Sequence, residues 1–181
     1  MRWALLIFFF AGLAQAQVSF QKCLQCHQAS GSALGPTLEG QSQEYLAKQL
    51  WDYKLKNRIH SKMNEIAAAL SEAQIQDMAK FFSHRPWPKT AESQTSPEII
   101  EKGRVLAEQI GCFSCHQESY EGFGKAPRLK GQKAAYLQAE LLKFRDQRRS
   151  NDLGLMFTFT NFLTDEDIES LSQYLSGKPH H

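Results

Sequence analysis

Hydrophobic residues recur at helical spacing in two separate parts of the chain. They fall at Tyr45, Leu46, Leu50 and Tyr53 in the first part, and at Tyr136, Leu137, Leu141 and Phe144 in the second. Apolar residues three and four positions apart lie on one face of an α-helix. No stretch alternates apolar and polar residues convincingly, as a half-buried strand does. The pattern therefore predicts an all-α fold.

Residues that start helices mark three further helical segments. Ser71 with Gln74, and Thr164 with Asp167, have the spacing of a capping box. The apolar stripes that follow them are Ile75, Met78, Ala79 and Phe82, and then Ile168, Leu171 and Leu175. Ser96-Pro97 begins another helix, because proline is tolerated in the first turn. Each of these segments predicts a short amphipathic helix.

The two parts of the chain are copies of one pattern. Gly35-Pro36-Thr37-Leu38-Glu39-Gly40-Gln41 matches Ala126-Pro127-Arg128-Leu129-Lys130-Gly131-Gln132. Further matching pairs are Tyr45 with Tyr136, Leu50 with Leu141, Arg58 with Arg149, Met63 with Met156, and Leu70 with Leu163. Two prolines, Pro86 and Pro88, exclude a regular helix between the copies. We expect one domain over residues 17–83, a linker over 84–95 and a second domain over 96–181.

The first sixteen residues are typical of a secretory signal peptide. Arg2 precedes an apolar run from Trp3 to Leu13, and Ala14-Gln15-Ala16 forms an A-x-A cleavage site. We expect a mature protein that begins near Gln17 and is exported to the periplasm; a retained membrane anchor is the alternative. The formal net charge of +2 gives no indication of nucleic-acid binding.

All four cysteines lie in two C-x-x-C-H motifs, Cys23-Leu24-Gln25-Cys26-His27 and Cys112-Phe113-Ser114-Cys115-His116. This spacing is typical of covalent haem c attachment: the cysteines form thioethers with one haem, and the histidine is the proximal iron ligand. A zinc ribbon, structural disulfides and a thioredoxin-like redox pair are the alternatives. The zinc motif has no histidine directly after each cysteine pair. The redox pair belongs to a βαβ pattern that is lacking here. The motifs therefore predict two covalent haems.

A methionine is the expected second axial ligand of each iron. Met156 is the only methionine in the second half of the chain, and Met63 is its partner in the repeat. Met78 competes in the first half, but it falls within an apolar stripe, where a methionine more often fills the core. His60 and His84 are weaker alternatives, because a lone histidine in a polar loop is usually solvated.

These motifs, present twice, resemble a dihaem class I cytochrome c of the cytochrome c4 type. The resemblance rests on C-x-x-C-H, Gly-Pro-x-Leu-x-Gly-Gln, Tyr-Leu, Arg-x-x-x-x-Met and the closing helix, and it covers nearly all of residues 18–177. It implies two cytochrome c domains related by a pseudo-twofold axis, each wrapped around a haem, and periplasmic electron transfer. It also implies that the carbonyls of Pro36 and Pro127 orient the proximal histidines.

The first copy departs from this pattern before its haem motif. In the expected mature protein, only residues 17–22 are available for a helix before Cys23, whereas residues 96–111 are available before Cys112. In class I cytochromes c this helix crosses the C-terminal helix. We expect that crossing in the second copy, between Gly103 and Leu106 on one helix and Leu171 and Tyr174 on the other. In the first copy it must be much reduced.

The leading function is that of an electron carrier rather than an enzyme. Its partners would be redox proteins such as a cytochrome bc complex, a terminal oxidase or a periplasmic dehydrogenase, and it would be soluble or peripherally membrane-associated. The alternative is the haem subunit of a periplasmic oxidoreductase, such as a sulfide or thiosulfate dehydrogenase. A dihaem peroxidase needs an open iron, which a methionine candidate on each haem disfavours. The basic segment 143–149 is interpreted as a solvated helix end, or as a site that docks an acidic partner or neutralises haem propionates.

Overall fold

The computed structural model describes residues 20–27, 35–88 and 95–177, and over these ranges the chain is helical, as expected. The first unit holds a helical turn at residues 20–24 and three helices: α2 (Gln43–Lys54), α3 (Ser61–Ala68) and α4 (Glu72–Ser83). The second holds α5 (Pro97–Ile110), α6 (Phe113–His116), α7 (Ala134–Arg145), α8 (Leu155–Thr160) and α9 (Asp165–Ser176). Strand pairing in the described ranges is limited to an isolated bridge between Phe123 and Ala126. The proposed signal segment lies outside these ranges.

The predicted helix starts are confirmed at the last helix of each unit. Ser71 caps α4 in a capping box with Gln74, and Thr164 caps α9 in the same way with Asp167. Each box satisfies two backbone N–H groups that would otherwise lack a partner. Ser96 is the N-cap residue of α5, with Pro97 in its first turn, although the serine side chain makes no capping bond.

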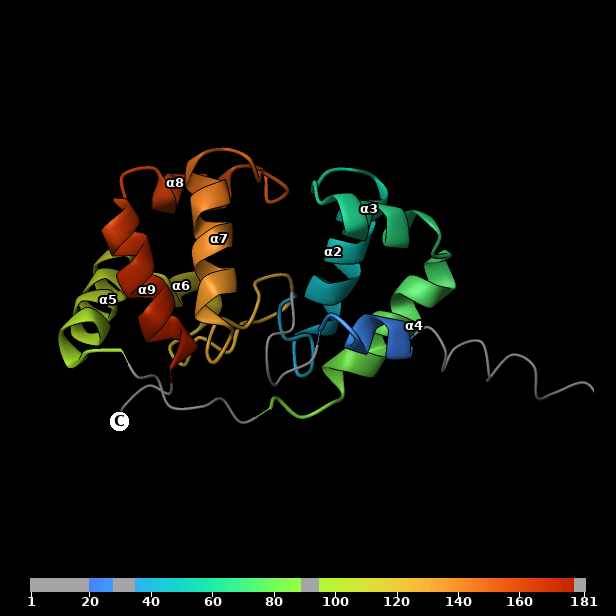
Figure 1. Cartoon of the computed structure of the whole chain (residues 1–181), viewed down its shortest axis with the longest axis horizontal. Coiled ribbons are helices and arrows are strands. Elements are labelled where there is room, and N and C mark those ends of the chain that lie inside the picture. Colours follow the sequence, from blue (N-terminus) through green and yellow to red (C-terminus); the bar gives the residue numbers. More distant parts are fainter. Residues whose placement is uncertain (1–19, 28–34, 89–94, 178–181) are drawn as a thin grey trace, which may run out of the picture.

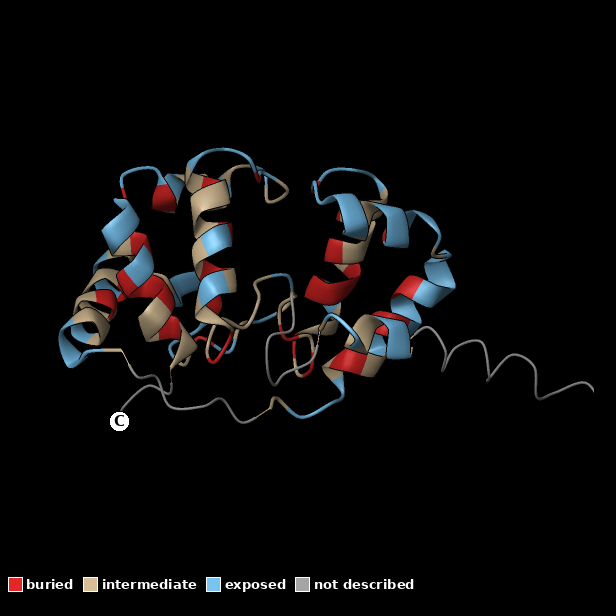
Figure 2. Ribbon diagram, in the orientation of Figure 1, coloured by how far each residue is buried: buried red, intermediate tan, exposed pale blue. Residues whose placement is uncertain are grey.

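Each unit has its own small apolar core (Figure 2). In the first unit, Leu46 and Ala47 of α2 pack against Ile75, Ala79 and Phe82 of α4. The second core is built from Ala107, Tyr120, Leu137, Leu163, Ile168, Leu171 and Leu175. The buried faces are the ones that the hydrophobic spacing predicts. Units of this size bury little surface, so a large cofactor would add much of the missing apolar centre.

The crossing of α5 and α9 explains why residue 103 is a glycine. A Cβ atom there would lie 2.1 Å from the backbone oxygen of Ser170 and 2.7 Å from Tyr174 Cβ. The two helices therefore touch backbone to backbone. In the first unit, only residues 20–22 of the described chain precede the haem motif, and Phe20 stacks on Phe81 with ring centroids 4.0 Å apart. The expected inequality of the two copies is confirmed.

The two units lie side by side, with α2 of the first and α7 of the second on either side of their junction (Figure 1). Reciprocal hydrogen bonds join them. Gln41 pairs with the backbone of Arg128 (2.7 and 2.9 Å), and Gln132 pairs with the backbone of Thr37 (3.0 and 2.9 Å). These residues are repeat partners, so the contact obeys a pseudo-twofold axis.

The motif glycines before these glutamines have the same backbone conformation. Gly40 has φ 69° and Gly131 has φ 75°, a region of backbone conformation that residues other than glycine rarely adopt. Each also donates its N–H to the last helix of its own unit, to Phe82 O and to Leu175 O, at 2.9 Å in both cases. The Gly-Gln pair thus turns the chain so that the glutamine reaches across the junction.

None of the helices in the described ranges has the length and apolar character needed to cross a membrane.

We expect Gly103→Ala to destabilise the protein by about 1–3 kcal/mol, because the new methyl group meets a backbone oxygen and forces α5 and α9 apart. Denaturant unfolding of the two proteins measures this. Gly177→Ala is the matched control, since its Cβ atom would meet Tyr174 O at 3.5 Å, an ordinary contact. Equal stability of the two variants would contradict the tight crossing.

Candidate functional site

The cysteine–histidine motifs lie in compact helical turns. In the first copy, His27 N bonds to Cys23 O at 2.9 Å, and in the second, His116 N bonds to Cys112 O at 3.1 Å. A bond between residues four apart closes one turn of helix. The two cysteines and the histidine of each motif therefore lie within a single turn of helix. None of the four cysteines forms a disulfide, so that alternative is not realised.

Each histidine is fixed by the carbonyl of a proline. His27 Nδ1 lies 2.9 Å from Pro36 O, and His116 Nδ1 lies 2.8 Å from Pro127 O. A carbonyl oxygen can only accept, so Nδ1 carries the proton and Nε2 keeps its lone pair. This tautomer is the one a metal-ligating histidine adopts, with its other nitrogen tied to an acceptor.

The loops between histidine and proline differ between the copies. Gly35 packs so closely that a Cβ atom there would lie 2.6 Å from the His27 ring. Ala126 stands at the matching position in the second copy, where the loop is two residues longer. The longer loop closes on the Phe123–Ala126 bridge, and Gly122 has φ 72°, with space so tight that a Cβ atom on it would lie 2.4 Å from Pro127 C. Two different loops therefore deliver the same histidine–carbonyl bond.

Burial sets the protonation states in the motifs. It raises the pKa of the Cys23 thiol, and it raises the pKa of Cys112 to about 11. These thiols are protonated at neutral pH, unlike zinc thiolates or redox-active pairs. Burial lowers the pKa of both histidines; at His27 the positive charges of Lys133 and His60 lower it further. The rings are therefore neutral, which is the form that binds a metal.

The candidate methionines both lie in the first turn of a short helix. Met63 N of α3 donates to His60 Nδ1 at 3.3 Å, and Met156 N of α8 donates to Asp152 Oδ2 at 2.7 Å. Both side chains are partly buried, whereas Met78 is 4% exposed within the first core. In Figure 1, α3 lies above the 20–24 turn and α8 lies above α6. Each methionine helix thus lies on the upper side of its unit, with the haem motif beneath it.

The alternative histidine ligands have structural roles. His60 is the N-cap residue of α3, and His84 is the C-cap residue of α4, with its Nδ1 2.8 Å from Lys80 O. Both are exposed.

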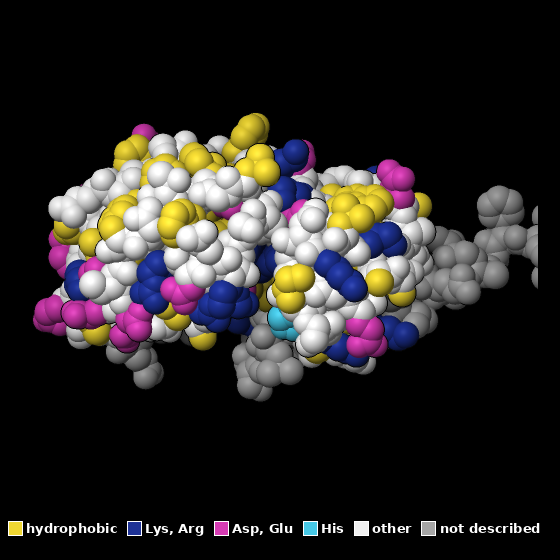
Figure 3. Space-filling view, turned by 90° about the horizontal axis from the view of Figure 1, so that it is seen from above, with side chains coloured by type: hydrophobic (Ala, Val, Ile, Leu, Met, Phe, Trp, Pro, Cys, Tyr) yellow, Lys and Arg dark blue, Asp and Glu magenta, His cyan; other side chains and the backbone are white. Residues whose placement is uncertain are grey.

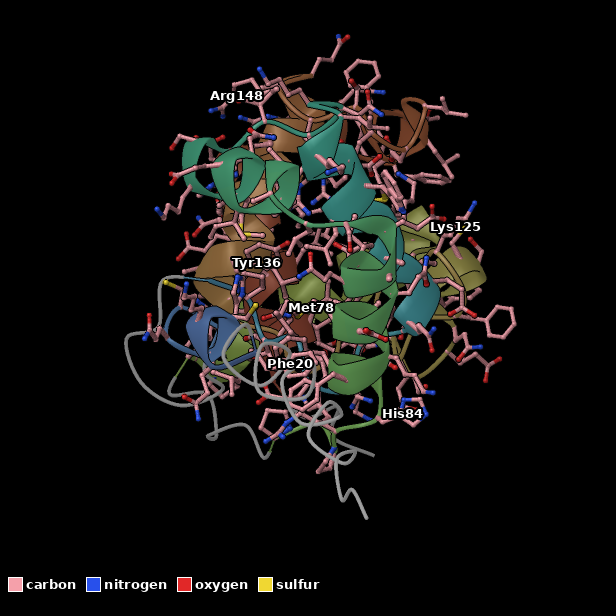
Figure 4. All side chains as sticks on the ribbon, turned by 90° about the vertical axis from the view of Figure 1, so that its right-hand side faces the viewer. Phe20, Met78, His84, Lys125, Tyr136 and Arg148 are labelled. Carbon is pink, nitrogen blue, oxygen red and sulfur yellow. The ribbon has the colours of Figure 1, made fainter. Side chains whose placement is uncertain are left out.

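A buried polar network at the junction was not anticipated from the sequence. Arg58 and Arg149 both donate to Glu140 Oε2, at 2.9 and 2.6 Å. Both also donate to Gln49 Oε1, at 2.7 and 3.1 Å. Tyr136 accepts a further bond from Arg58 at 3.0 Å; Figure 4 shows this residue behind the first unit. Arginines from both units thus share acceptors from both units.

Arg149 corrects the interpretation of the basic segment 143–149 as a solvated helix end. Arg148 is exposed, but Arg149 is only 8% exposed and pairs with Glu140. The repeat contained the signal, because Arg149 matches Arg58, which is 6% exposed. A charged residue kept in both copies without a place on an apolar stripe indicates a shared buried contact.

Electrostatic attraction dominates the state of Glu140. Burial raises its pKa, but the charges of Arg58 and Arg149, together with the Lys143 ammonium that donates to Glu140 Oε1 at 2.7 Å, outweigh burial and bring the pKa down to about 2. The carboxylate is therefore ionised at all but strongly acidic pH.

The described residues contain no group of three or more histidine, cysteine or acidic side chains that could hold a metal ion by themselves. A zinc ribbon would require such a group. Each motif instead offers a single neutral histidine as a metal ligand, which fits an iron whose equatorial ligands the haem itself would supply.

Comparison with known proteins agrees with this geometry. The family model for cytochrome c matches residues 13–85 and again residues 100–178. Cytochrome c4 of Thiocapsa roseopersicina is 34% identical over 169 residues, which covers 86% of each chain. The crystal structure of reduced recombinant cytochrome c4 from Pseudomonas stutzeri superposes with a TM-score of 0.77 at 29% identity, over 91% of this chain and 97% of that one. The chain is a dihaem cytochrome c of the cytochrome c4 type.

Membership of this family means two covalently attached haem c groups and a role in electron transfer. Another relative of this dihaem cytochrome is a thiosulfate dehydrogenase electron acceptor from Thiomonas intermedia. It is 32% identical over 182 residues, which covers 93% of this chain and 84% of that protein. The local chemistry fits the cofactor: cysteine thiols that form no disulfide, an Nε2 lone pair on each histidine, and a loop without a side chain against His27.

The buried network at the junction of this cytochrome should contribute to its free energy of unfolding. We expect Glu140→Gln to cost about 3–5 kcal/mol at neutral pH, because it leaves two buried arginines without their shared anion. The pKa of Glu140 is lower in the folded protein than the ordinary 4.5, so its contribution is complete above about pH 4.5 and is lost as the pH falls towards 2.

Denaturant unfolding at a series of pH values measures this, and the difference between the variant and the wild type should shrink across that window. Glu65→Gln is the control, since Glu65 pairs with Lys62 on the surface with 71% of its side chain exposed. A Glu140→Gln protein as stable as this control would show that the network contributes little.

Proposed function

We propose that the chain carries single electrons in the periplasm through two haems with histidine and methionine axial ligands. Cys23 and Cys26 would hold the first haem and Cys112 and Cys115 the second. His27 with Met63, and His116 with Met156, would ligate the irons. The observation that carries this is the histidine–proline carbonyl bond, which two loops of different length make in the same way.

Haem iron supplies the electron chemistry by alternating between the ferric and ferrous states. The chain's own residues hold the iron ligands in place. Pro36 O and Pro127 O keep the proton on Nδ1 and increase the basicity of the ligating nitrogen. Met63 and Met156 would each supply a thioether ligand, which would favour the ferrous state and leave no position on the iron for a substrate.

Export and the kind of partner are supported by different observations. The N-terminal pattern of Arg2, the apolar run and Ala14-Gln15-Ala16 supports a periplasmic location. The thiosulfate dehydrogenase electron acceptor among the relatives supports a periplasmic dehydrogenase as an electron donor. A cytochrome bc complex and a terminal oxidase are further partners in this proposal.

The face above α3 and α8 offers a surface for such partners (Figure 3). Hydrophobic side chains are visible on this face of both units. Next to the starts of α3 and α8, Ile59 is 68% exposed, Leu153 102% and Leu155 53%. Lys and Arg side chains gather between them, near the junction. Apolar contact surrounded by charge suits a short-lived encounter between redox proteins.

The second candidate is a permanent haem subunit of a periplasmic oxidoreductase. The Thiomonas intermedia relative favours it, because it matches over most of its own length. Affinity purification from periplasm separates the two candidates. A dehydrogenase subunit that co-purifies in equal amount and survives high salt would identify a subunit; a cytochrome that purifies alone and is reduced by catalytic amounts of thiosulfate dehydrogenase would identify a carrier.

The ligand assignment has its own test. Met156→Ala should open one haem to carbon monoxide, remove its sulfur-to-iron charge-transfer band and lower its reduction potential, because the thioether favours ferrous iron. Met63→Leu should do the same to the other haem. Met78→Leu is the matched control and should have none of these three effects, at a cost in stability below about 1.5 kcal/mol for a volume-conserving swap.

Spectra and redox titrations of the three variants decide the assignment. The assignment in the first domain is wrong if Met78→Leu opens an iron while Met63→Leu leaves both closed.

A further inference from the structure

The position after the Gly-Gln pair differs in charge between the two domains. In the first domain it is Ser42, and in the second it is Lys133. Both begin a helix: Ser42 is the N-cap of α2 and Lys133 the N-cap of α7. The Ser42 hydroxyl accepts from Tyr45 N at 3.1 Å, whereas Lys133 makes no side-chain capping bond. A lysine therefore stands where helix stability favours serine.

Both side chains reach across the junction to the haem loop of the other domain. The Ser42 hydroxyl donates to Gly124 O, and the Lys133 ammonium donates to Gly35 O at 2.8 Å. The duplication has thus kept the direction of the contact and changed its charge. The loop of the second domain receives a neutral hydroxyl, and the loop of the first receives a cation.

Gly35 places that cation close to the first histidine. A Cβ atom on Gly35 would lie 2.6 Å from both Cε1 and Nδ1 of His27, so the residue that accepts from Lys133 is in contact with the imidazole. Lys133 is partly buried, so water screens its charge less than it screens a fully exposed lysine.

We propose that Lys133 of the second domain raises the reduction potential of the haem held by the first domain. A fixed positive charge favours the form of the haem that has gained an electron. Ser42 gives the second haem no such charge, so the same contact separates the two potentials. The inference rests on the proposed ligation of the first iron by His27. In it, Lys133 acts indirectly, by placing a positive charge from one domain next to the haem of the other.

Other charged groups near Lys133 modify the effect. Glu39, a buried residue in the loop that follows Pro36, has an attractive influence on Lys133. Arg85 lies 3.8 Å from the Glu39 carboxylate and offsets part of its charge. His60 is the other titratable group whose charge acts on His27. All variants are therefore compared at a single pH and ionic strength.

The test compares three variants of the full-length holoprotein. Lys133→Gln keeps a side chain that can donate to Gly35 O but removes the charge. Lys133→Arg keeps both. Lys102→Gln removes the same unit of charge from α5 on the outer side of the second domain, where Lys102 pairs with Glu166 and Asp167. Redox titration followed by the haem-methyl NMR signals reports each haem separately.

We expect Lys133→Gln to lower the potential of the first haem and to leave that of the second unchanged. Lys133→Arg should restore the wild-type value, and Lys102→Gln should shift neither haem appreciably. The proposal is overturned if Lys133→Gln leaves the first potential unchanged, shifts both haems equally, or is matched by Lys133→Arg.

Two further measurements complete the test. Ser42→Lys, which adds the missing cation to the second loop, should raise the potential of the second haem; a fall or no change counts against the proposal. The sulfur-to-iron band of the wild type is recorded first. Its absence from the first haem would refute the proposed ligation, whereas its presence with unmoved potentials would refute only the role of Lys133.

Discussion

Two arginines, one from each domain, donate to a single buried carboxylate oxygen of Glu140. Burying three charges is costly unless each finds its counterpart, so this arrangement exists only while the domains are together. Gln49 supplies the other shared acceptor, and the glutamine–backbone pairs of Gln41 and Gln132 lie on the same junction. The positions of the two haem loops therefore depend on the junction as much as on either core.

The link from junction to haem is short. Thr37 and Arg128 receive the cross-domain glutamines, and each directly follows the proline whose carbonyl holds a histidine. A change at the junction reaches the histidine through one peptide unit. This explains why a cytochrome with two small domains keeps an elaborate polar contact instead of an apolar one: hydrogen bonds fix direction, which the hydrophobic effect does not.

Much of this could be predicted from the sequence. The helices, the capping boxes and the two haem motifs follow local rules of spacing and capping, and the duplication doubled these signals. The crossing at Gly103 followed from the resemblance to class I cytochromes c. The junction network could not be predicted, because a buried Arg149 and a solvated Arg148 look alike along the chain and differ only in what another domain places beside them. Asn151, which donates to Gln49 at 3.0 Å, and Asp52, which accepts from Asn151 at 2.6 Å, belong to no motif at all. The contact of Lys133 with the other domain could not be predicted for the same reason. Ser42 stands at the matching position, so the repeat gives no indication of what a lysine does there.

The reciprocal contacts have a consequence for how such a protein arises. Gln41 meets Arg128 while Gln132 meets Thr37, so each patch of surface binds the repeat partner of itself. That is the geometry of an isologous dimer of identical subunits. A covalent connection adds no contact to such an interface; it only raises the effective concentration of one half around the other. Fusion then frees the two copies to diverge, and Ser42 and Lys133 are a divergence that no homodimer could hold.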